Sequence, residues 1–291
     1  MTLSSNRKHP WSLVRWINII LAVFLLALFV VRGDVLLQRV RYWVTGTVMI
    51  DGIKFSLPSN NPFQSHWLFA GSRYTEVTAT KLMGSVLHRG DVFVDVGASI
   101  GWFTLFAAKL VGGGGRVIAF EPDPESFSEL RRNVEINGFR HVMLEQKALS
   151  RETGRVKFFL RASPENRGIV SFGDKQPVIE VETLRLDDYL RRNPTRVDFI
   201  KIDTEGAEGL ILEGMHETIK QNARIKLLIE FDPVMLKAAG TDPQKLLVGL
   251  TGRGFDIFCV DERQGKLIHV RKDEIPELAR TWQGNLFMQR S

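Results

Sequence analysis

Residues 91–104 read DVFVDVGASIGWFT, in which an apolar run of strand length meets two glycines and then a stretch of helical period. Gly97 lets the chain turn sharply and lets a ligand approach the backbone. The free amides at the start of the following helix favour an anionic group. The spacing is Gly-x-x-x-Gly rather than Gly-x-Gly-x-x-Gly, so the turn is less suited to bind the pyrophosphate of a dinucleotide. A nucleotide-type turn and a purely structural turn both remain open at this point.

An acidic residue, Glu121, ends the next predicted strand, residues 116–121. A carboxylate at the carboxyl end of a second strand can accept hydrogen bonds from both hydroxyls of a ribose. The alternative is an exposed carboxylate at a helix start, but Asp123 fills that role as an N-cap before Pro124. Glu121 is therefore expected to be available to a nucleoside cofactor, and NAD enzymes share this feature.

Charged residues also occupy a third strand that otherwise resembles buried core, residues 197–203. Lys201 and Asp203 share one face of this strand because side chains alternate. Unpaired ions are expensive in such a place. The functional interpretation puts Asp203 and Glu205 beside a ligand, since open α/β sheets bind ligands beyond the carboxyl ends of their strands. The structural alternative is an ion pair of Lys201 with a carboxylate. Glu230 is a similar case, because it directly follows the apolar run 227–229.

Apolar runs of strand length alternate with stretches of helical period from residue 91 onward, which predicts a parallel sheet with helices on both faces. The predicted strands are 92–96, 116–121, 141–146, 197–203 and 226–231, and the predicted helices are 100–111, 124–137 and 205–220. Residues 155–161 and 177–182 predict further strands or a hairpin, and 255–260, 266–270 and 285–289 predict a final antiparallel element. Residues 47–57 predict two short strands around an Asp-Gly turn.

The N-terminal region predicts a membrane anchor. Between Trp16 and Val31 only Asn18 is polar, and extension back to Trp11 gives a helix long enough for a hydrocarbon core. The stretch after it lacks a small-x-small cleavage site, so an anchor is favoured over a cleaved signal peptide. The expected organisation is a tail at 1–10, an anchor at 11–32, a linker with a small hairpin and helix at 33–90, and one α/β domain at 91–291.

Composition excludes several classes of function. The net charge is +6 and 44% of residues are hydrophobic, but Lys and Arg are scattered, so no nucleic-acid partner is expected. Cys259 is the single cysteine and lies in an apolar run, so no intramolecular disulfide can form. The six histidines have no partner at metal-ligand spacing, and no metal site is expected.

Four motifs taken together resemble the FkbM family of methyltransferases. They are DVGASIG at 95–101, FEPD at 120–123, NVEING at 133–138 and KIDTEGAE at 201–208. The resemblance spans roughly residues 47–290 and leaves out the predicted anchor. It implies the Rossmann-like class I methyltransferase fold, with a seven-stranded, mostly parallel sheet whose last strand is antiparallel.

The resemblance also implies S-adenosylmethionine as cofactor and O-methylation of a hydroxyl on a sugar, glycolipid or other small natural product. Asp95, Gly97, Ala98 and Gly101 would contact the methionyl end of the cofactor and Glu121 the ribose. The adenine would lie at the segment made of Gln146, Lys147 and Ala148. Since this cofactor is made in the cytosol, a cytosolic catalytic domain on a single-pass anchor is expected. Lys and Arg residues are equally numerous just before and just after the predicted anchor, so the charges do not predict its orientation.

A hydroxyl acceptor must lose its proton during methyl transfer. Asp203 or Glu205 is the candidate general base, and Lys201 is placed to orient the carboxylate. Two rival functions share parts of the pattern. An NAD(P)-dependent oxidoreductase shares the glycine turn and the ribose carboxylate, but the missing third glycine and the antiparallel tail count against it. A catalytically inactive membrane-bound scaffold would keep the fold, but the intact Glu121 and Asp203 count against it.

Overall fold

The structure is a computed structural model, which describes residues 46–56, 76–161, 167–171, 173 and 175–290. The chain divides into two compact units, Met1–Gly71 and Ser72–Ser291. The described part of the first unit is a hairpin of β1 (Thr47–Ile50) and β2 (Ile53–Ser56), which pair antiparallel. Asp51 and Gly52 at its turn both have positive φ, 47° and 76°, as a two-residue hairpin turn requires. The predicted hairpin is confirmed.

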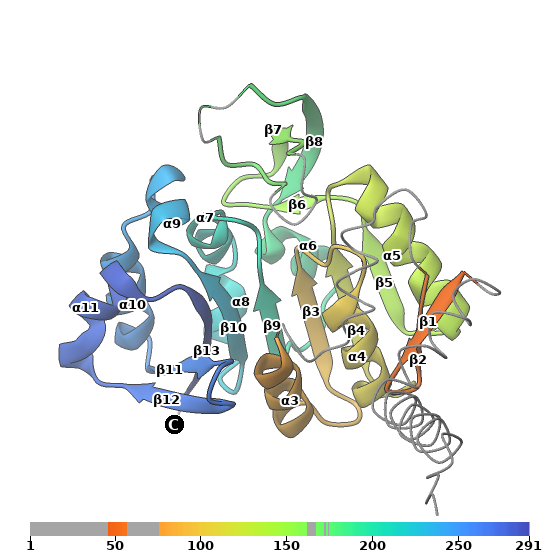
Figure 1. The fold of residues 1–291 in the computed structure, drawn as a ribbon, viewed down its shortest axis with the longest axis horizontal. Helices are drawn as coiled ribbons and strands as arrows, with labels where there is room; N and C mark the ends of the chain where they lie inside the picture. The colour runs from red at the N-terminus through yellow and green to blue at the C-terminus, as the bar shows by residue number, and fades with distance from the viewer. Residues whose placement is uncertain (1–45, 57–75, 162–166, 172, 174, 291) are drawn as a thin grey trace, which may run out of the picture. The chain divides into compact units, whose positions relative to one another are not determined.

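The second unit is built on one mixed sheet with the strand order β12-β11-β13-β10-β9-β3-β4-β5 (Figure 1). The five strands from β10 to β5 are parallel to one another, and β13 is antiparallel to both of its neighbours. The strand bounds are β3 (Val92–Val96), β4 (Arg116–Phe120), β5 (Val142–Glu145), β9 (Phe199–Ile202), β10 (Lys226–Phe231), β11 (Phe255–Asp261), β12 (Lys266–Val270) and β13 (Gly284–Arg290).

The main sheet therefore has eight strands, one more than the seven that the family resemblance predicted. The antiparallel last strand, β13, is present between β10 and β11, but β12 adds an eighth strand at the outer edge. Four of its five residues, beginning with Lys266, are exposed. It pairs antiparallel with β11 after a tight turn, as predicted for residues 266–270, and its exposed residues leave it outside the hydrophobic core.

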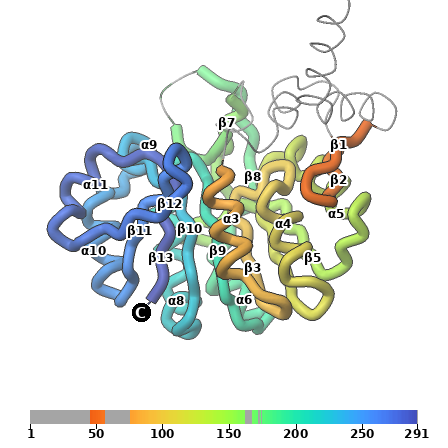
Figure 2. The backbone as a smooth tube through the Cα atoms, turned by 60° about the horizontal axis from the view of Figure 1, so that its bottom comes forward, coloured from red at the N-terminus to blue at the C-terminus, as the bar shows by residue number. Residues whose placement is uncertain are grey.

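Helices cover both faces of the sheet (Figures 1 and 2). One face carries α3 (Val77–Val86), α4 (Trp102–Val111) and α5 (Pro124–Asn137). The other carries α6 (Leu186–Arg192), α7 (Glu208–Glu213), α8 (His216–Gln221), α9 (Pro233–Ala238), α10 (Pro243–Gly252) and α11 (Ile275–Thr281), which follows the 3₁₀ turn η2 (Lys272–Glu274). These six helices share one hydrophobic cluster with the buried strand residues beneath them. The main unit begins at Ser72, so it includes α3.

Most predicted element bounds agree with the structure, with one informative exception. Strand β10 and helix α5 match the predicted ranges 226–231 and 124–137, and Asp123 caps α5 by accepting a hydrogen bond from the Glu125 amide at 3.1 Å. The single helix predicted at 205–220 is instead two helices, α7 and α8, separated at Gly214. A Cβ on Gly214 would lie 2.1 Å from the carbonyl oxygen of Ser150, so the chain approaches another backbone closely there.

A second, three-stranded sheet lies beyond the ends of the main strands (Figure 1). Its order is β6-β8-β7, with β6 (Ala148–Leu149), β7 (Gly154–Phe159) and β8 (Val178–Leu184). Strands β7 and β8 form the antiparallel hairpin that was one of the two predictions for this region. Ala148 packs with Phe158 and Val181 in a small hydrophobic cluster.

Among the residues that the structure describes, no helix combines the length and the apolar character needed to cross a membrane. The predicted tail at 1–10 and anchor at 11–32 lie outside the described residues, as does much of the region 33–90.

Candidate functional site

The carboxyl ends of β3, β4, β9 and β10 meet at one edge of the main sheet, which we call the carboxyl edge (Figure 1). The turn after β3 lies directly against the end of β9. A Cβ on Gly97 (φ 78°) would lie only 1.8 Å from the carbonyl oxygen of Asp203. The amides of Gly97 and Ala98 donate to the carbonyl oxygen of Phe120 at 3.0 and 3.1 Å. Contact between two backbones therefore requires the glycine, where the sequence pattern suggested the approach of a ligand.

Asp95 and Gly101 lie beneath this edge rather than on it. Asp95 is fully buried, and its Oδ2 accepts a hydrogen bond of 2.6 Å from the Thr104 hydroxyl. Burial raises the pKa of Asp95 above its usual value. Gly101 caps α4 with φ 99°, and a Cβ there would lie 2.7 Å from the Leu130 side chain. Both residues shape the β3–α4 turn from inside.

Glu121 joins the two turns that follow β3 and β4. Its Oε2 accepts a hydrogen bond of 2.7 Å from the Ser99 amide, and its Oε1 accepts one of 2.8 Å from the Asp123 amide. The residue is buried, and burial raises its pKa to about 7 in spite of these two hydrogen bonds. Each carboxylate oxygen keeps a second lone pair for a ligand hydroxyl. Glu121 is thus held at the predicted position, at the end of β4.

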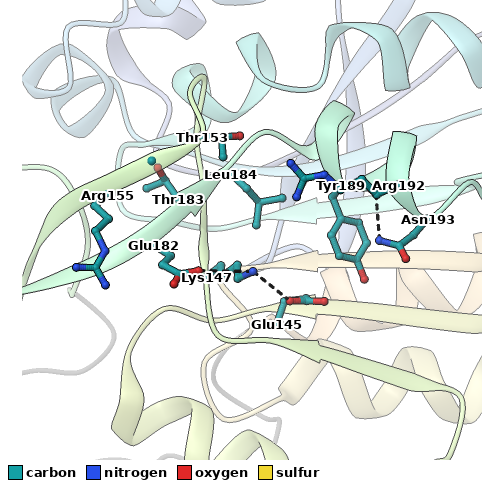
Figure 3. A pocket seen from close by; sticks show the side chains of 11 residues that line it. Glu145, Lys147, Thr153, Arg155, Glu182, Thr183, Leu184, Tyr189, Arg192 and Asn193 are labelled. Atoms are coloured by element: carbon teal, nitrogen blue, oxygen red, sulfur yellow. Dashed lines mark hydrogen bonds and ion pairs between the residues drawn. The ribbon is translucent and has the colours of Figure 1, made fainter.

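The segment predicted to contact adenine follows β5. Gln146 is exposed, and the Lys147 ammonium lies 4.0 Å from a carboxylate oxygen of Glu145 and 3.6 Å from one of Glu182. Glu145, Lys147 and Glu182 line a polar cavity of about 500 Å³, shown in Figure 3, between the end of β5, the small sheet and α6.

This cavity opens on the α6 side of the sheet. Glu145 is in register with Phe120, so both side chains leave the same face. Phe120 packs edge-on against Tyr189 of α6, with ring centroids 5.2 Å apart. The cavity is therefore on the opposite face from α4, whose Phe103 ring contacts Lys201.

Lys201 lies beneath the carboxyl edge and interacts with several carboxylates there. Its ammonium donates to Asp203 Oδ2 at 2.7 Å and lies 4.5 Å from the centroid of the Phe103 ring. Burial works to lower the pKa of Lys201, but the neighbouring Asp203, Glu76 and Asp95 raise it above its usual range. Lys201 is therefore a permanent cation, and the structural ion pair considered as an alternative is present within the candidate site.

Three carboxylates cluster above this lysine: Asp203, Glu205 and Glu230 each place an oxygen within 4.8 Å of the others. Burial of Asp203 works to raise its pKa, but Lys201 and a hydrogen bond from Glu230 hold it below the usual value. The charge of Asp203, with burial second, raises the pKa of Glu230 well above its ordinary value. Burial, then the charges of Asp203 and Glu208, raise the pKa of Glu205 to about 8.

The chain bends sharply after Asp203 to bring Glu205 back to this cluster. Glu205 and Gly206 have positive φ, 57° and 104°, and a Cβ on Gly206 would lie 2.8 Å from the carbonyl oxygen of Met235. Glu208 fixes the bend, because its buried Oε1 accepts hydrogen bonds from the Thr204 amide, the Thr204 hydroxyl and the Gly206 amide at 2.9, 2.9 and 3.2 Å. A left-handed glutamate between two such restraints marks a strained position of the kind found at functional sites.

Sequence reasoning missed Glu76 and Asn285. Glu76 precedes α3 in a left-handed conformation (φ 55°), and its Oε1 accepts a long hydrogen bond of 3.5 Å from Asn285 Nδ2. Burial, with the charge of Lys201 acting against it, raises the pKa of Glu76 to about 7. The polar Asn285 at the start of an apolar strand was a weak signal. No role was predicted for Glu76, because its place beside Lys201 and Asn285 depends on packing between segments far apart in the sequence.

A further missed element is the segment 167–171. Arg167 Nη1 donates to Asp123 Oδ2 at 2.5 Å and to Glu125 Oε2 at 3.0 Å. At Gly168 a Cβ would lie 3.4 Å from the carbonyl oxygen of Thr204 and 3.7 Å from Glu205 Cβ. The segment therefore runs from the start of α5, close to Glu121, to the acidic cluster, and it bounds the carboxyl edge between them.

Comparison with known proteins gives a consistent family. Residues 95–257, more than half of the chain, match the Methyltransferase FkbM domain. The chain is 32% identical over 168 residues to 31-O-demethyl-FK506 methyltransferase FkbM of Streptomyces tacrolimicus, covering 46% of this chain and 63% of that protein. It is 29% identical over 145 residues to Methyltransferase 1 of Beauveria bassiana (strain ARSEF 2860), covering 43% and 58%.

The chain thus spans about three fifths of the length of these two relatives. Among solved structures, it is similar to Methyltransferase FkbM from Methylobacillus flagellatus KT, with a TM-score of 0.42 and 20% identity over 68% of this chain and 43% of that one. The matched range 95–257 contains the strand ends that carry Glu121, Asp203 and Glu230. The chain belongs to the FkbM methyltransferase domain family.

Proposed function

We propose that this protein is an S-adenosylmethionine-dependent O-methyltransferase. The observation that carries the proposal is the FkbM domain match over 95–257, because that range supplies both Glu121 and the cluster of Asp203, Glu205 and Glu230 at the carboxyl edge. Ligands of open α/β sheets bind at this edge.

The residues present fit the cofactor chemically. The ribose hydroxyls of S-adenosylmethionine are donors, and Glu121 offers a carboxylate held in place by the Ser99 and Asp123 amides. The methionyl end carries an ammonium and a sulfonium, and the carboxylate of Asp203, whose pKa is lowered, supplies the opposite charge. When bound, the cofactor supplies an electrophilic methyl group.

Glu205 is the residue best suited to accept the proton of the acceptor. A general base works best when its pKa is close to the working pH, and that of Glu205 is raised to about 8. Asp203 is less suited, since its Oδ2 is held by Lys201 at 2.7 Å and its pKa is lowered. In the step we propose, the hydroxyl proton moves to Glu205 as the oxygen bonds the methyl carbon, and the electron pair of the broken S–CH₃ bond stays on sulfur.

The acceptor proposed is a hydroxyl of a sugar, glycolipid or other small natural product. One relative is named for methylation of 31-O-demethyl-FK506, and this name supports an oxygen acceptor. The membrane anchor at 11–32 and a cytosolic domain belong to the same proposal, since an apolar segment would bring the enzyme to a lipid-linked acceptor.

A thermal-shift experiment on the purified chain separates this proposal from its rivals. S-Adenosylmethionine, S-adenosylhomocysteine and NAD⁺ are each added in excess, and ligands that bind the folded state raise the midpoint. The proposal expects a shift with both adenosyl compounds and none with NAD⁺. A shift with NAD⁺ alone would support an oxidoreductase, and no shift with any of the three would support an inactive scaffold.

A further inference from the structure

We propose that Asp203, Glu205 and Glu230, together with the amide oxygen of Asn285, form a binding site for one hard divalent cation, Mg²⁺, Mn²⁺ or Ca²⁺. No metal site was expected from the sequence, because only histidine and cysteine spacings were considered there. The role given to the cation below rests on the proposed function, whereas the binding itself does not.

Strand register brings the four residues together. Ile202 of β9 pairs with Ile229 of β10, so the next residues along each strand, Asp203 and Glu230, come side by side where the two parallel strands end. Glu230 is paired directly with Asn285 of the antiparallel β13, so these two side chains leave the same face. The bend after Asp203 adds Glu205 from the loop.

The spacing of the carboxylate oxygens suits a single ion. One oxygen from each carboxylate lies within 4.8 Å of the other two. Oxygens on opposite sides of a Ca²⁺ ion, at 2.3–2.6 Å each, are about 4.6–5.2 Å apart, and those around Mg²⁺ are about 4.0–4.2 Å apart at most. The cluster can therefore surround Ca²⁺ nearly as it stands and Mg²⁺ after a small contraction. The three residues are half-buried, so an ion can reach them.

Asn285 gives independent support for a ligand at this position. It is only 8% exposed, and its Oδ1 has no hydrogen-bond partner among the described residues. An unsatisfied buried acceptor is costly unless something binds it. Its Nδ2 is turned toward Glu76, while the free oxygen belongs to a side chain that stands directly opposite Glu230. Amide oxygen and carboxylates are the donor types that these cations select.

Lys201 completes the arrangement without occupying it. It holds Asp203 through Oδ2, and the ion would take the place of the proton that Glu230 donates to Asp203. Hydrogen bonds of this kind to a ligating carboxylate orient the ligand. Lys201 balances one of the three carboxylate charges, and a divalent ion would balance the other two.

In the reaction, the cation would coordinate the oxygen of the acceptor hydroxyl. Four protein oxygens leave open positions on an ion with six or more ligands. Coordination makes the hydroxyl more acidic, as it does for metal-bound water. The proton then passes to the second oxygen of Glu205, which does not need to ligate the ion.

The test uses the complete purified chain, freed of metals with a chelator and titrated with Mn²⁺ while the free ion is followed by electron paramagnetic resonance. We expect one saturable site per chain, competed by Mg²⁺ or Ca²⁺. Glu230→Gln should weaken Mn²⁺ binding about tenfold or more. Asn285→Ala, which changes no charge, should weaken it about threefold or more. Glu213→Gln, at an exposed position near the end of α7, is the matched control and should bind as the wild type does.

Circular dichroism shows which variants are folded. If Glu230→Gln does not fold, Mn²⁺ binding is measured with Asp203→Asn instead. The proposal is overturned if the wild type shows no saturable Mn²⁺ site, or if folded variants at 203 and 230 bind Mn²⁺ as the control does. The same samples are titrated with S-adenosylmethionine by calorimetry. If the wild type binds S-adenosylmethionine but has no saturable Mn²⁺ site, only the cation site is rejected. If it binds Mn²⁺ but not S-adenosylmethionine, only the proposed function is rejected.

Discussion

The backbone carbonyl of Asp203 lies so close to Gly97 that a Cβ at residue 97 would be 1.8 Å from its oxygen. Gly97→Ala therefore cannot be accommodated without moving β9 away from β3, and the positive φ of 78° adds strain. We expect the variant to lose about 2 kcal/mol or more of unfolding free energy, measured by urea denaturation.

Gly249→Ala is the matched control for Gly97→Ala. Gly249 lies within α10, where a Cβ meets nothing within 4 Å. Alanine is a better helix former than glycine by roughly 1 kcal/mol, so this variant should be as stable as the wild type or more so. Equal stability of the two variants would contradict the close approach of the strands.

The buried carboxyl of Glu208 predicts a dependence of stability on pH. Burial raises its pKa from 4.5 to about 7 although it accepts three hydrogen bonds. A group whose pKa is higher in the folded state contributes stability that is present below pH 4.5 and is lost as the pH rises through 7.

Glu208→Gln tests this sign, because the amide oxygen still accepts hydrogen bonds but cannot ionise. The wild type should lose stability relative to the variant between pH 5 and 8.5, and Glu213→Gln corrects for the loss of one formal charge. Denaturation curves at several pH values give the difference. A wild type that gains stability relative to Glu208→Gln over this range would show that the pKa is lowered instead.

Glu205→Gln should abolish most methyl transfer without removing the cofactor site. We expect turnover to fall by about 10²–10⁴, as for loss of a general base, while the dissociation constant for S-adenosylmethionine changes by less than about threefold. Single-turnover rates with any acceptor that the wild type methylates measure this step. Turnover close to that of the wild type would reject Glu205 as the proton acceptor and return the role to Asp203.

Much of the fold follows from local sequence. Strand β10 is a continuous apolar run, and α5 starts at an Asp-Pro cap and ends at a left-handed glycine, so both have clear signals. The division of the helix predicted at 205–220 was not visible, because Gly214 is required by Ser150, a residue distant in sequence. Strand β12 was predicted at 266–270, and only the number of strands that the family resemblance implied, seven, differs from the structure.

The candidate site was only half predictable for the same reason. Lys201 and Asp203 stood out because ions are unexpected in an apolar strand, and Glu121 because it ends one. Asn285 and Glu76 reach the site through strand pairing and helix packing, which no local pattern encodes. Gly97 also has a role that no local pattern shows, because the backbone at the end of β9 lies against it.

The most direct test of the account is the binding of S-adenosylmethionine by calorimetry to the wild type and to Glu121→Ala. Glu121 is held by the Ser99 and Asp123 amides for two ribose hydroxyls, and hydrogen bonds to a charged group contribute about 1.5–3 kcal/mol each. We predict one cofactor molecule per wild-type chain, displaced by S-adenosylhomocysteine, and at least a tenfold weaker affinity in a folded Glu121→Ala variant. Absence of binding to the wild type, or an unchanged affinity in the variant, would contradict the placement of the cofactor at the carboxyl edge.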